Sequence, residues 1–226
     1  MRLPWLTAGL VALCATASLV PGGAEALQYD RARVAAGEVW LLLTGQMVHW
    51  SARMTAADLG MLLALGAWLE IQGERKRLAR ALVLGAGLSA LAVHALSPDL
   101  SLYRGASGMA SALFVLAALR IGEDTGEAPR FLAWLAVALF LGKDAWEAVT
   151  GQTLFAGQLP DGVEVVPLVH LLGGLAGLVS ILGATPALSV DGRRAAQDPP
   201  GFRRSSLRGL AGHGAAPQGL DPQQSQ

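Results

Sequence analysis

Two polar residues that lie in apolar segments have side chains that can do chemistry together. Ser107 lies in the sequence YRGASG, where a loop leads into an apolar run, and His170 lies early in a later apolar run. A serine hydroxyl becomes a nucleophile when an imidazole takes its proton, and the same imidazole can then protonate a leaving amine. Because polar side chains are costly inside a membrane, we interpret Ser107 and His170 as a nucleophile and its base.

Small residues surround both members of this pair. Gly105 and Gly108 flank Ser107, so they allow a tight turn and leave backbone N–H groups free to face a developing oxyanion. Gly173, Gly174 and Gly177 follow His170 at helical spacing and form a small face on which another helix can pack closely. Glycine and serine are also common in membrane helices for packing alone, so that reading of the same residues stays open.

The other polar residues of the apolar runs offer weaker alternatives. Asp58 lies near the start of one run, and His94 lies at the end of another, where an interfacial position is expected. Lys143, Asp144 and Glu147 share one segment, and their spacing predicts an interfacial ion pair. A Ser–Lys dyad with Lys143 is chemically feasible, but His170 is the simpler base.

Composition assigns this chemistry to a membrane. Of the 226 residues 53% are apolar and only 15% are charged, which is well below the charged fraction of a typical soluble domain. The formal net charge is zero, so no basic excess suggests a nucleic-acid partner. The single cysteine, Cys14, has no disulfide partner and is expected to pack in an apolar run. We expect neither a metal nor a cofactor.

Six apolar runs predict an all-α polytopic membrane protein. Each run is close to the length of about 20 residues that a helix needs to cross the hydrocarbon core. The runs cover residues 3–20, 54–71, 79–97, 106–121, 131–149 and 165–185. The apolar stretch at 39–50 is shorter and suits an interfacial or re-entrant segment.

The distribution of Lys and Arg predicts the orientation. With the N-terminus inside, twelve of the 17 Lys and Arg residues fall in cytoplasmic segments and five in outer ones, which favours both termini in the cytoplasm. The runs that hold Ser107 and His170 then both enter from the outside, at a similar shallow depth. We divide the chain into a first span or cleaved signal at 1–26, a core with five spans at 27–185 and a disordered tail at 186–226.

Four segments in this order resemble the rhombosortase branch of the rhomboid proteases. They are LQYDRARVAAGEVWLLLTGQMVHWS, YRGASG, LGKDAWEAVTGQTLF and VVPLVHLLGGLAGL, and they span residues 27–182. The resemblance implies the six-helix rhomboid fold in a bacterial inner membrane, a Ser107–His170 dyad and a cavity that opens to the periplasmic side. It also implies substrates that carry a C-terminal sorting tail with a Gly-Gly motif, one apolar span and a basic end.

The sequence departs from the rhomboid pattern where many members stabilise the oxyanion with side chains. Met54 and Asp58 stand at the positions of a histidine and an asparagine in the second span. A thioether donates no hydrogen bond, and an ionised carboxylate repels an oxyanion. Asp58 is therefore expected either to be a protonated donor or to anchor a helix end. Ser111 stands where a larger ring is common, and Trp40-Leu41 replaces a Trp-Arg pair.

Several functions remain open from the sequence. The favoured one is a rhombosortase-type protease that is embedded in the lipid bilayer and acts there. A general rhomboid protease with other single-span substrates and a catalytically silent rhomboid-like protein that binds membrane helices are the alternatives. A transporter fits less well, because ionisable residues are sparse within the runs and no pair of broken helices is evident.

Overall fold

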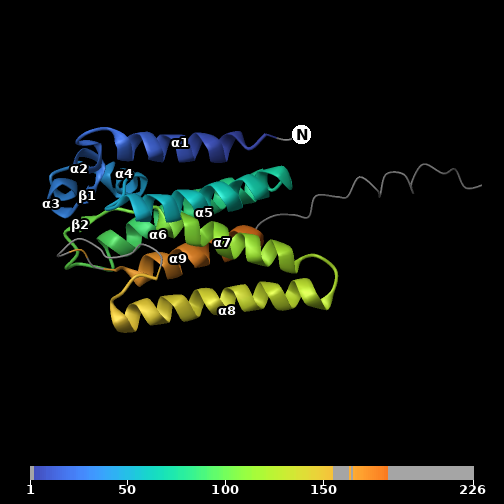
Figure 1. The fold of residues 1–226 in the computed structure, drawn as a ribbon. Helices are drawn as coiled ribbons and strands as arrows, with labels where there is room; N and C mark the ends of the chain where they lie inside the picture. Colours follow the sequence, from blue (N-terminus) through green and yellow to red (C-terminus); the bar gives the residue numbers. More distant parts are fainter. Residues whose placement is uncertain (1–2, 155–162, 164, 183–226) are drawn as a thin grey trace, which may run out of the picture. The chain divides into compact units, whose positions relative to one another are not determined.

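Long apolar helices make up most of the described chain (Figure 1). The computed structural model describes residues 3–154, 163 and 165–182, all of which belong to one compact unit, Met1–Thr185. The tail expected at 186–226 lies outside the described residues. The six apolar runs coincide with six helices, which are α1 (Trp5–Leu19), α5 (Ala52–Ile71), α6 (Arg75–His94), α7 (Ser107–Gly122), α8 (Glu127–Thr150) and α9 (Pro167–Leu182). The expectation of a mostly helical fold is therefore confirmed.

The helices differ in how well they fit a membrane crossing by length and composition. Among the described residues, α5 and α6 each have 20 residues and an apolar composition that suffices to cross a membrane. Helices α1, α7 and α9 are apolar but have only 15 or 16 residues. Helix α8 has 24 residues and carries charges at both ends. Two helices thus meet the criterion for a span, and the count of six spans stays a prediction.

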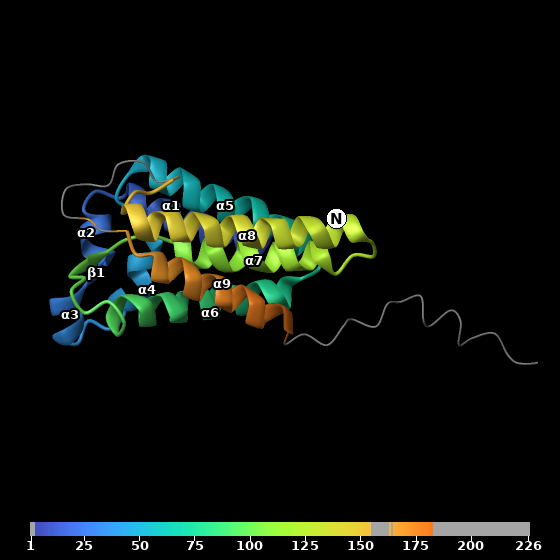
Figure 2. The ribbon, with the colours of Figure 1, turned by 90° about the horizontal axis from the view of Figure 1, so that it is seen from below.

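Helix α7 lies at the centre of the helical unit. Its neighbours are α5, α6, α8 and α9, while α1 packs on α5 (Figures 1 and 2). Most residues from Gly108 to Ala118 are buried, and Leu113 and Leu116 are almost fully enclosed. Large apolar side chains on the outer helices are exposed instead, including Phe131 and Trp134 of α8. This arrangement suits an apolar solvent around the unit, because water would penalise such surfaces.

Short elements gather at one end of the long helices (Figure 1). They are α2 (Gly23–Leu27), β1 (Tyr29–Asp30), α3 (Arg31–Ala35), α4 (Leu41–Thr44), the 3-10 helix η1 (Gly45–Met47) and β2 (Leu102–Tyr103). Strands β1 and β2 pair antiparallel, with Tyr29 opposite Tyr103. The side chain of Arg31 donates to the backbone oxygens of Val93, His94, Ser97 and Leu100, and so fastens this region to the end of α6.

The stretch at 39–50 forms short helical turns, α4 and η1, and no long helix. Gln46 is buried there, and its amide nitrogen donates to the backbone oxygen of Ala86 in α6 at 2.9 Å. A buried amide of this kind ties the segment to the helices because its donor would otherwise be unsatisfied. The segment is therefore held against α6.

Ion pairs join the loops at the opposite end. Arg77 of α6 pairs with Glu123 at 2.8 Å, and Arg120 of α7 pairs with Glu74 at 3.0 Å. Arg75 pairs with the buried carboxylate of Glu70 at 3.1 Å. Acidic residues of the two loops, Glu74 and Glu123, are thus paired with arginines at the ends of α7 and α6. This polar end and the end with the short elements lie on opposite sides of the apolar helices.

Candidate active site

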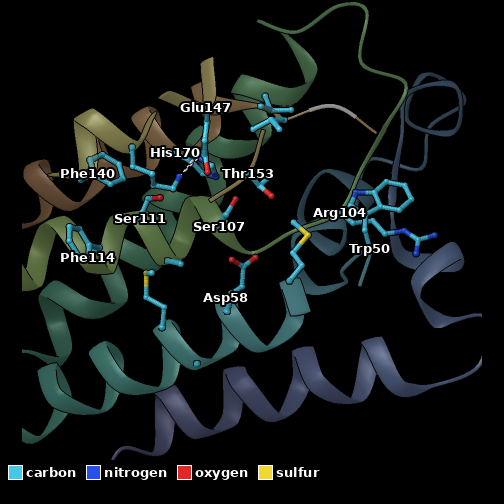
Figure 3. Close-up of a pocket in the computed structure, with 18 of the residues that line it drawn as sticks. Trp50, Asp58, Arg104, Ser107, Ser111, Phe114, Phe140, Glu147, Thr153 and His170 are labelled. Atoms are coloured by element: carbon cyan, nitrogen blue, oxygen red, sulfur yellow. Dashed lines mark hydrogen bonds and ion pairs between the residues drawn. The ribbon is translucent and has the colours of Figure 1, made fainter. Parts of the chain in front are cut away.

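A cavity of about 620 Å³ lies between α5, α7, α8 and α9, near the end that carries the short elements. Ser107 and His170 both line it, although they come from different helices. In the close-up of Figure 3, Ser107 lies between His170 and Asp58. Apolar side chains form much of the remaining wall, including Met61, Leu65, Phe114, Leu139 and Phe140. The cavity thus combines a few polar groups with an apolar lining, which is the usual character of a ligand site.

The helix start at Ser107 provides backbone donors. Ser107 is the first residue of α7, and the first intrahelical bond runs from Ala110 N to Ala106 O at 3.0 Å. The N–H groups of Ser107, Gly108 and Met109 precede that bond, so they have no acceptor within the helix. Helix N-termini bind anions because these N–H groups and the helix dipole act together. The nucleophile candidate therefore sits where an oxyanion is favoured.

Gly105 makes the turn that brings the chain to this helix start. Its φ of +144° lies in a region that side-chain-bearing residues avoid. Its N–H donates to the backbone oxygen of Gly45 at 3.1 Å, so Gly105 supplies the turn, and its own N–H is already used. The buried hydroxyl of Tyr103 donates to the Gly105 oxygen at 3.2 Å and also shares a hydrogen bond with the side chain of Ser107. Burial raises the pKa of Tyr103, so this hydroxyl stays neutral.

His170 meets three charged groups of α8. Its Nδ1 lies 3.1 Å from Asp144 Oδ1, 3.2 Å from Glu147 Oε2 and 3.0 Å from Lys143 Nζ. The sequence predicts an ion pair within this segment, and Lys143 does lie 2.6 Å from Glu147. Both carboxylate side chains are only 2% exposed, so they are buried against His170, and the ion pair is part of the site. The signal that could have revealed this was three ionisable residues in one apolar run.

Asp144, Glu147 and His170 also offer three ligand atoms within 4.8 Å of one another, a spacing that a metal ion could use. The ammonium of Lys143 lies among them, at 3.0 Å from Asp144 and 2.6 Å from Glu147. A positive charge therefore already occupies the position that a cation would take. The arrangement fits an ion-pair network around the imidazole better than a metal centre.

The glycines after His170 determine how closely α9 approaches α7. A Cβ at Gly173 would overlap the backbone oxygen of Gly108, and one at Gly177 would overlap the backbone oxygen of Ala112. A Cβ at Gly174 would lie 2.9 Å from the ring of Phe140. Such backbone contact is what small residues allow between membrane helices. Since Gly108 follows Ser107, this contact also fixes the position of the nucleophile candidate relative to α9.

Asp58 and Met54 of α5 contact the turn that precedes Ser107. Asp58 Oδ2 accepts a hydrogen bond from Ala106 N–H at 3.0 Å and lies 3.3 Å from His49 Nε2. Asp58 therefore acts as an acceptor that anchors the residue before Ser107, which corresponds to the anchoring alternative. The methyl group of Met54 packs against Gly105, where an added Cβ would lie 2.6 Å away. Sequence reasoning assigned no role here to His49 or Tyr103, because their partners are distant in the chain.

Comparison with known families agrees with this geometry. A family model described as the Rhomboid domain matches residues 36–186, a range that includes Ser107, His170 and the α8 carboxylates. No curated protein sequence matches the chain. The family match covers more than half of the chain, from the short elements before α5 through α9. The chain therefore belongs to the rhomboid family of membrane-embedded serine proteases.

Proposed function

We propose that this chain is an intramembrane serine endopeptidase of the rhombosortase type, with Ser107 as nucleophile and His170 as its base. The observation that carries the proposal is that Ser107 and His170, from α7 and α9, line one cavity. The Nδ1 of His170 is engaged by α8, so Nε2 is the ring nitrogen that can serve as base. The apolar walls of the cavity suit a segment of polypeptide that leaves the lipid.

The proposed reaction has two halves. Ser107 Oγ attacks the carbonyl carbon of the scissile peptide bond while its proton passes to His170 Nε2. The N–H groups of Ser107 and Gly108 stabilise the oxyanion, the C–N bond breaks, and the imidazolium gives its proton to the leaving amine. Water then attacks the acyl-serine ester, again with His170 as base, which releases the carboxylic acid and restores the Ser107 hydroxyl.

The proposed substrates are membrane-anchored proteins that end in a Gly-Gly motif, one apolar span and a short basic segment. The four segments that resemble rhombosortases support this choice. Two single-span reporters that differ only in Gly-Gly against Val-Val test it, with the released fragment measured by immunoblot. Cleavage of the Gly-Gly reporter alone is expected. Equal cleavage of both would indicate a general rhomboid protease, and cleavage of neither would favour the silent helix binder.

The proposed placement is a bacterial inner membrane, with six spans, both termini in the cytoplasm and the cavity open to the periplasm. The cavity and Tyr103 lie near the end with the short elements, while Arg75, Arg77 and Arg120 lie at the other end. Basic residues favour the cytoplasmic side. Alkaline phosphatase fused after Tyr103 is therefore expected to be active, and the same fusion after Arg77 inactive. The reverse pattern would contradict both the orientation and the periplasmic cavity.

A pair of substitutions at Asp58 tests its role as an anchor. Asp58→Asn retains an oxygen that can accept from Ala106 N–H, so cleavage is expected to stay within about fivefold of the parent. Asp58→Leu removes the acceptor and leaves a backbone donor unsatisfied, which costs about 1–3 kcal/mol in stability and shifts Ser107. Cleavage rates and melting temperatures in detergent measure both effects. Equal and severe loss of cleavage in the two variants would show that the carboxylate charge itself is required.

A further inference from the structure

Three charged residues of α8 lie at the Nδ1 atom of His170. We refer to Lys143, Asp144 and Glu147 as the α8 cluster. Lys143 and Glu147 also line the cavity, and Figure 3 shows Glu147 close to His170. Asp144 is not among the lining residues, and its side chain is only 2% exposed. Asp144 is thus positioned to act on the imidazole and not on a substrate.

The cluster determines which ring nitrogen of His170 carries the proton. Two carboxylate oxygens and one ammonium lie within 3.2 Å of Nδ1. The carboxylates accept hydrogen bonds only, so a proton on Nδ1 satisfies them, whereas an unprotonated Nδ1 would place its lone pair against both. Lys143 also lies 3.0 Å from Nδ1, and Asp144 and Glu147 accept from two of its three N–H groups at 3.0 Å and 2.6 Å. Because two carboxylate oxygens oppose one ammonium at Nδ1, the favoured tautomer carries its proton on Nδ1 and leaves Nε2 free to accept.

The charges of the cluster also favour the form of His170 that arises during the reaction. Two carboxylates and one ammonium leave one negative charge uncompensated beside the ring. When His170 takes the proton of Ser107, the resulting imidazolium makes the group neutral. Among the described residues, the other ionisable groups that line the cavity are Asp58 of α5, Tyr103 and Arg104. Coulombic attraction at these short distances is strengthened because the side chains of Asp144 and Glu147 are only 2% exposed.

Asp144 is better suited than Glu147 to hold the ring. Asp144 Oδ1 lies 3.1 Å from Nδ1 and Glu147 Oε2 lies 3.2 Å from it, so both carboxylates can reach the ring. Glu147 also accepts from the backbone N–H of Leu154 at 3.1 Å, so it anchors the chain that follows α8. The second oxygen of Asp144, Oδ2, is buried and has no hydrogen-bond partner among the residues that the structure describes. The buried carboxylate thus depends on His170 and Lys143 for its stabilisation.

We propose that Asp144 is a positioning residue that holds His170 in the Nδ1–H tautomer and stabilises its imidazolium form, so that the site works as a Ser–His–Asp triad. This inference rests on the proposed protease function. In such triads the carboxylate stays ionised, orients the imidazole and need not touch the substrate. Lys143 keeps the pair of buried carboxylates from repelling each other. Asp144 itself forms no covalent bond and accepts no proton in the two-step reaction.

The test measures kcat and KM for cleavage of the Gly-Gly reporter by the full-length protein in detergent micelles. The variants are Asp144→Asn, Asp144→Ala and Asp144→Glu, each alone and in the His170→Ala background. Glu70→Gln is the matched control, because Glu70 is a buried carboxylate at the opposite end that accepts from Thr7 N–H at 2.7 Å. Melting temperatures are recorded for all variants.

Asp144→Asn and Asp144→Ala are expected to lower kcat by about a hundredfold to ten-thousandfold with KM nearly unchanged. Asp144→Glu is expected to recover part of the loss, since it restores a carboxylate. In the His170→Ala background none of the three should lower the residual rate further, because Asp144 acts through His170. Glu70→Gln is expected to lower the melting temperature and leave kcat within about twofold, the ordinary effect of a structural carboxylate.

Three results would overturn the inference. One is a folded Asp144→Asn protein that keeps the parental kcat while Ser107→Ala is inactive, which would leave a working dyad without an orienting carboxylate. Another is a loss of kcat that only follows the melting temperature, as in Glu70→Gln. The third is a parent protein whose cleavage does not depend on Ser107, and this result alone would also remove the proposed function.

Discussion

Ser107→Ala and His170→Ala are each expected to reduce cleavage of the Gly-Gly reporter by at least about a thousandfold, to the background rate. The first removes the attacking oxygen, and the second leaves its hydroxyl without a base. Alanine preserves the helix at either position, so both proteins should stay folded. Ser107→Ala should keep a melting temperature close to that of the parent, whereas His170→Ala should lower it, because the buried Asp144 loses its imidazole partner.

The double variant distinguishes a catalytic unit from two independent effects. Nucleophile and base act in the same step, so Ser107→Ala with His170→Ala is expected to be no worse than either alone. Ser180→Ala is a suitable control, because Ser180 is a buried serine on α9 that donates to the backbone oxygen of Ala176. Cleavage that survives in Ser107→Ala would refute the mechanism and turn attention to a Lys143-based site or to the silent binder.

Gly173→Ala is also expected to have a large effect on cleavage, although it adds a single methyl group. The new Cβ would overlap the backbone oxygen of Gly108, so α9 must move away from α7. Overpacking of this kind costs about 1–3 kcal/mol in stability. It also separates His170 from Ser107, and a displacement of about 1 Å in a reacting pair lowers the rate by about a hundredfold.

Gly87→Ala provides the matched comparison. Gly87 lies in the middle of α6, and a Cβ added there meets no atom within 4 Å. The substitution is expected to leave cleavage unchanged and to leave stability equal or slightly raised, because alanine favours helix over glycine. Cleavage rates and melting temperatures are measured for both Gly173→Ala and Gly87→Ala. A Gly173→Ala protein that behaves like Gly87→Ala would show that close α7–α9 contact does not position the dyad.

The positions of the long helices could be predicted from hydropathy, but their ends could not. The third run was expected at 79–97, whereas α6 begins at Arg75. The helix includes these charged residues because Arg75 and Arg77 pair with Glu70 of α5 and Glu123 after α7, which are contacts between elements that hydropathy does not reveal. Likewise α8 begins at Glu127, before the apolar run at 131–149. An apolar run marks the part suited to lipid, and a helix extends beyond it where polar groups find partners.

Ser107 and His170 were predicted because a polar side chain in an apolar run has a free-energy cost that the sequence makes visible. The glycines of α9 were predicted because their helical spacing is visible within one segment. The contact of Asp144 with His170 was missed, because it depends on which face α8 turns toward α9. The contact between Asp58 and Ala106 N–H was also not predicted, since the sequence left Asp58 either as a protonated oxyanion donor or as an anchor of a helix end. Side-chain chemistry could thus be read from single residues, whereas the partners of buried charges required the fold.

The most direct measurement of the central claim is covalent labelling of the full-length protein in micelles with a serine-reactive fluorophosphonate. Peptide mass spectrometry then locates the adduct. The account predicts one adduct, on Ser107, that is lost in Ser107→Ala and strongly reduced in His170→Ala, because only a base-activated hydroxyl displaces fluoride at a useful rate. Labelling that is absent from Ser107, or equal in the parent and His170→Ala, would contradict Ser107 as a nucleophile activated by His170.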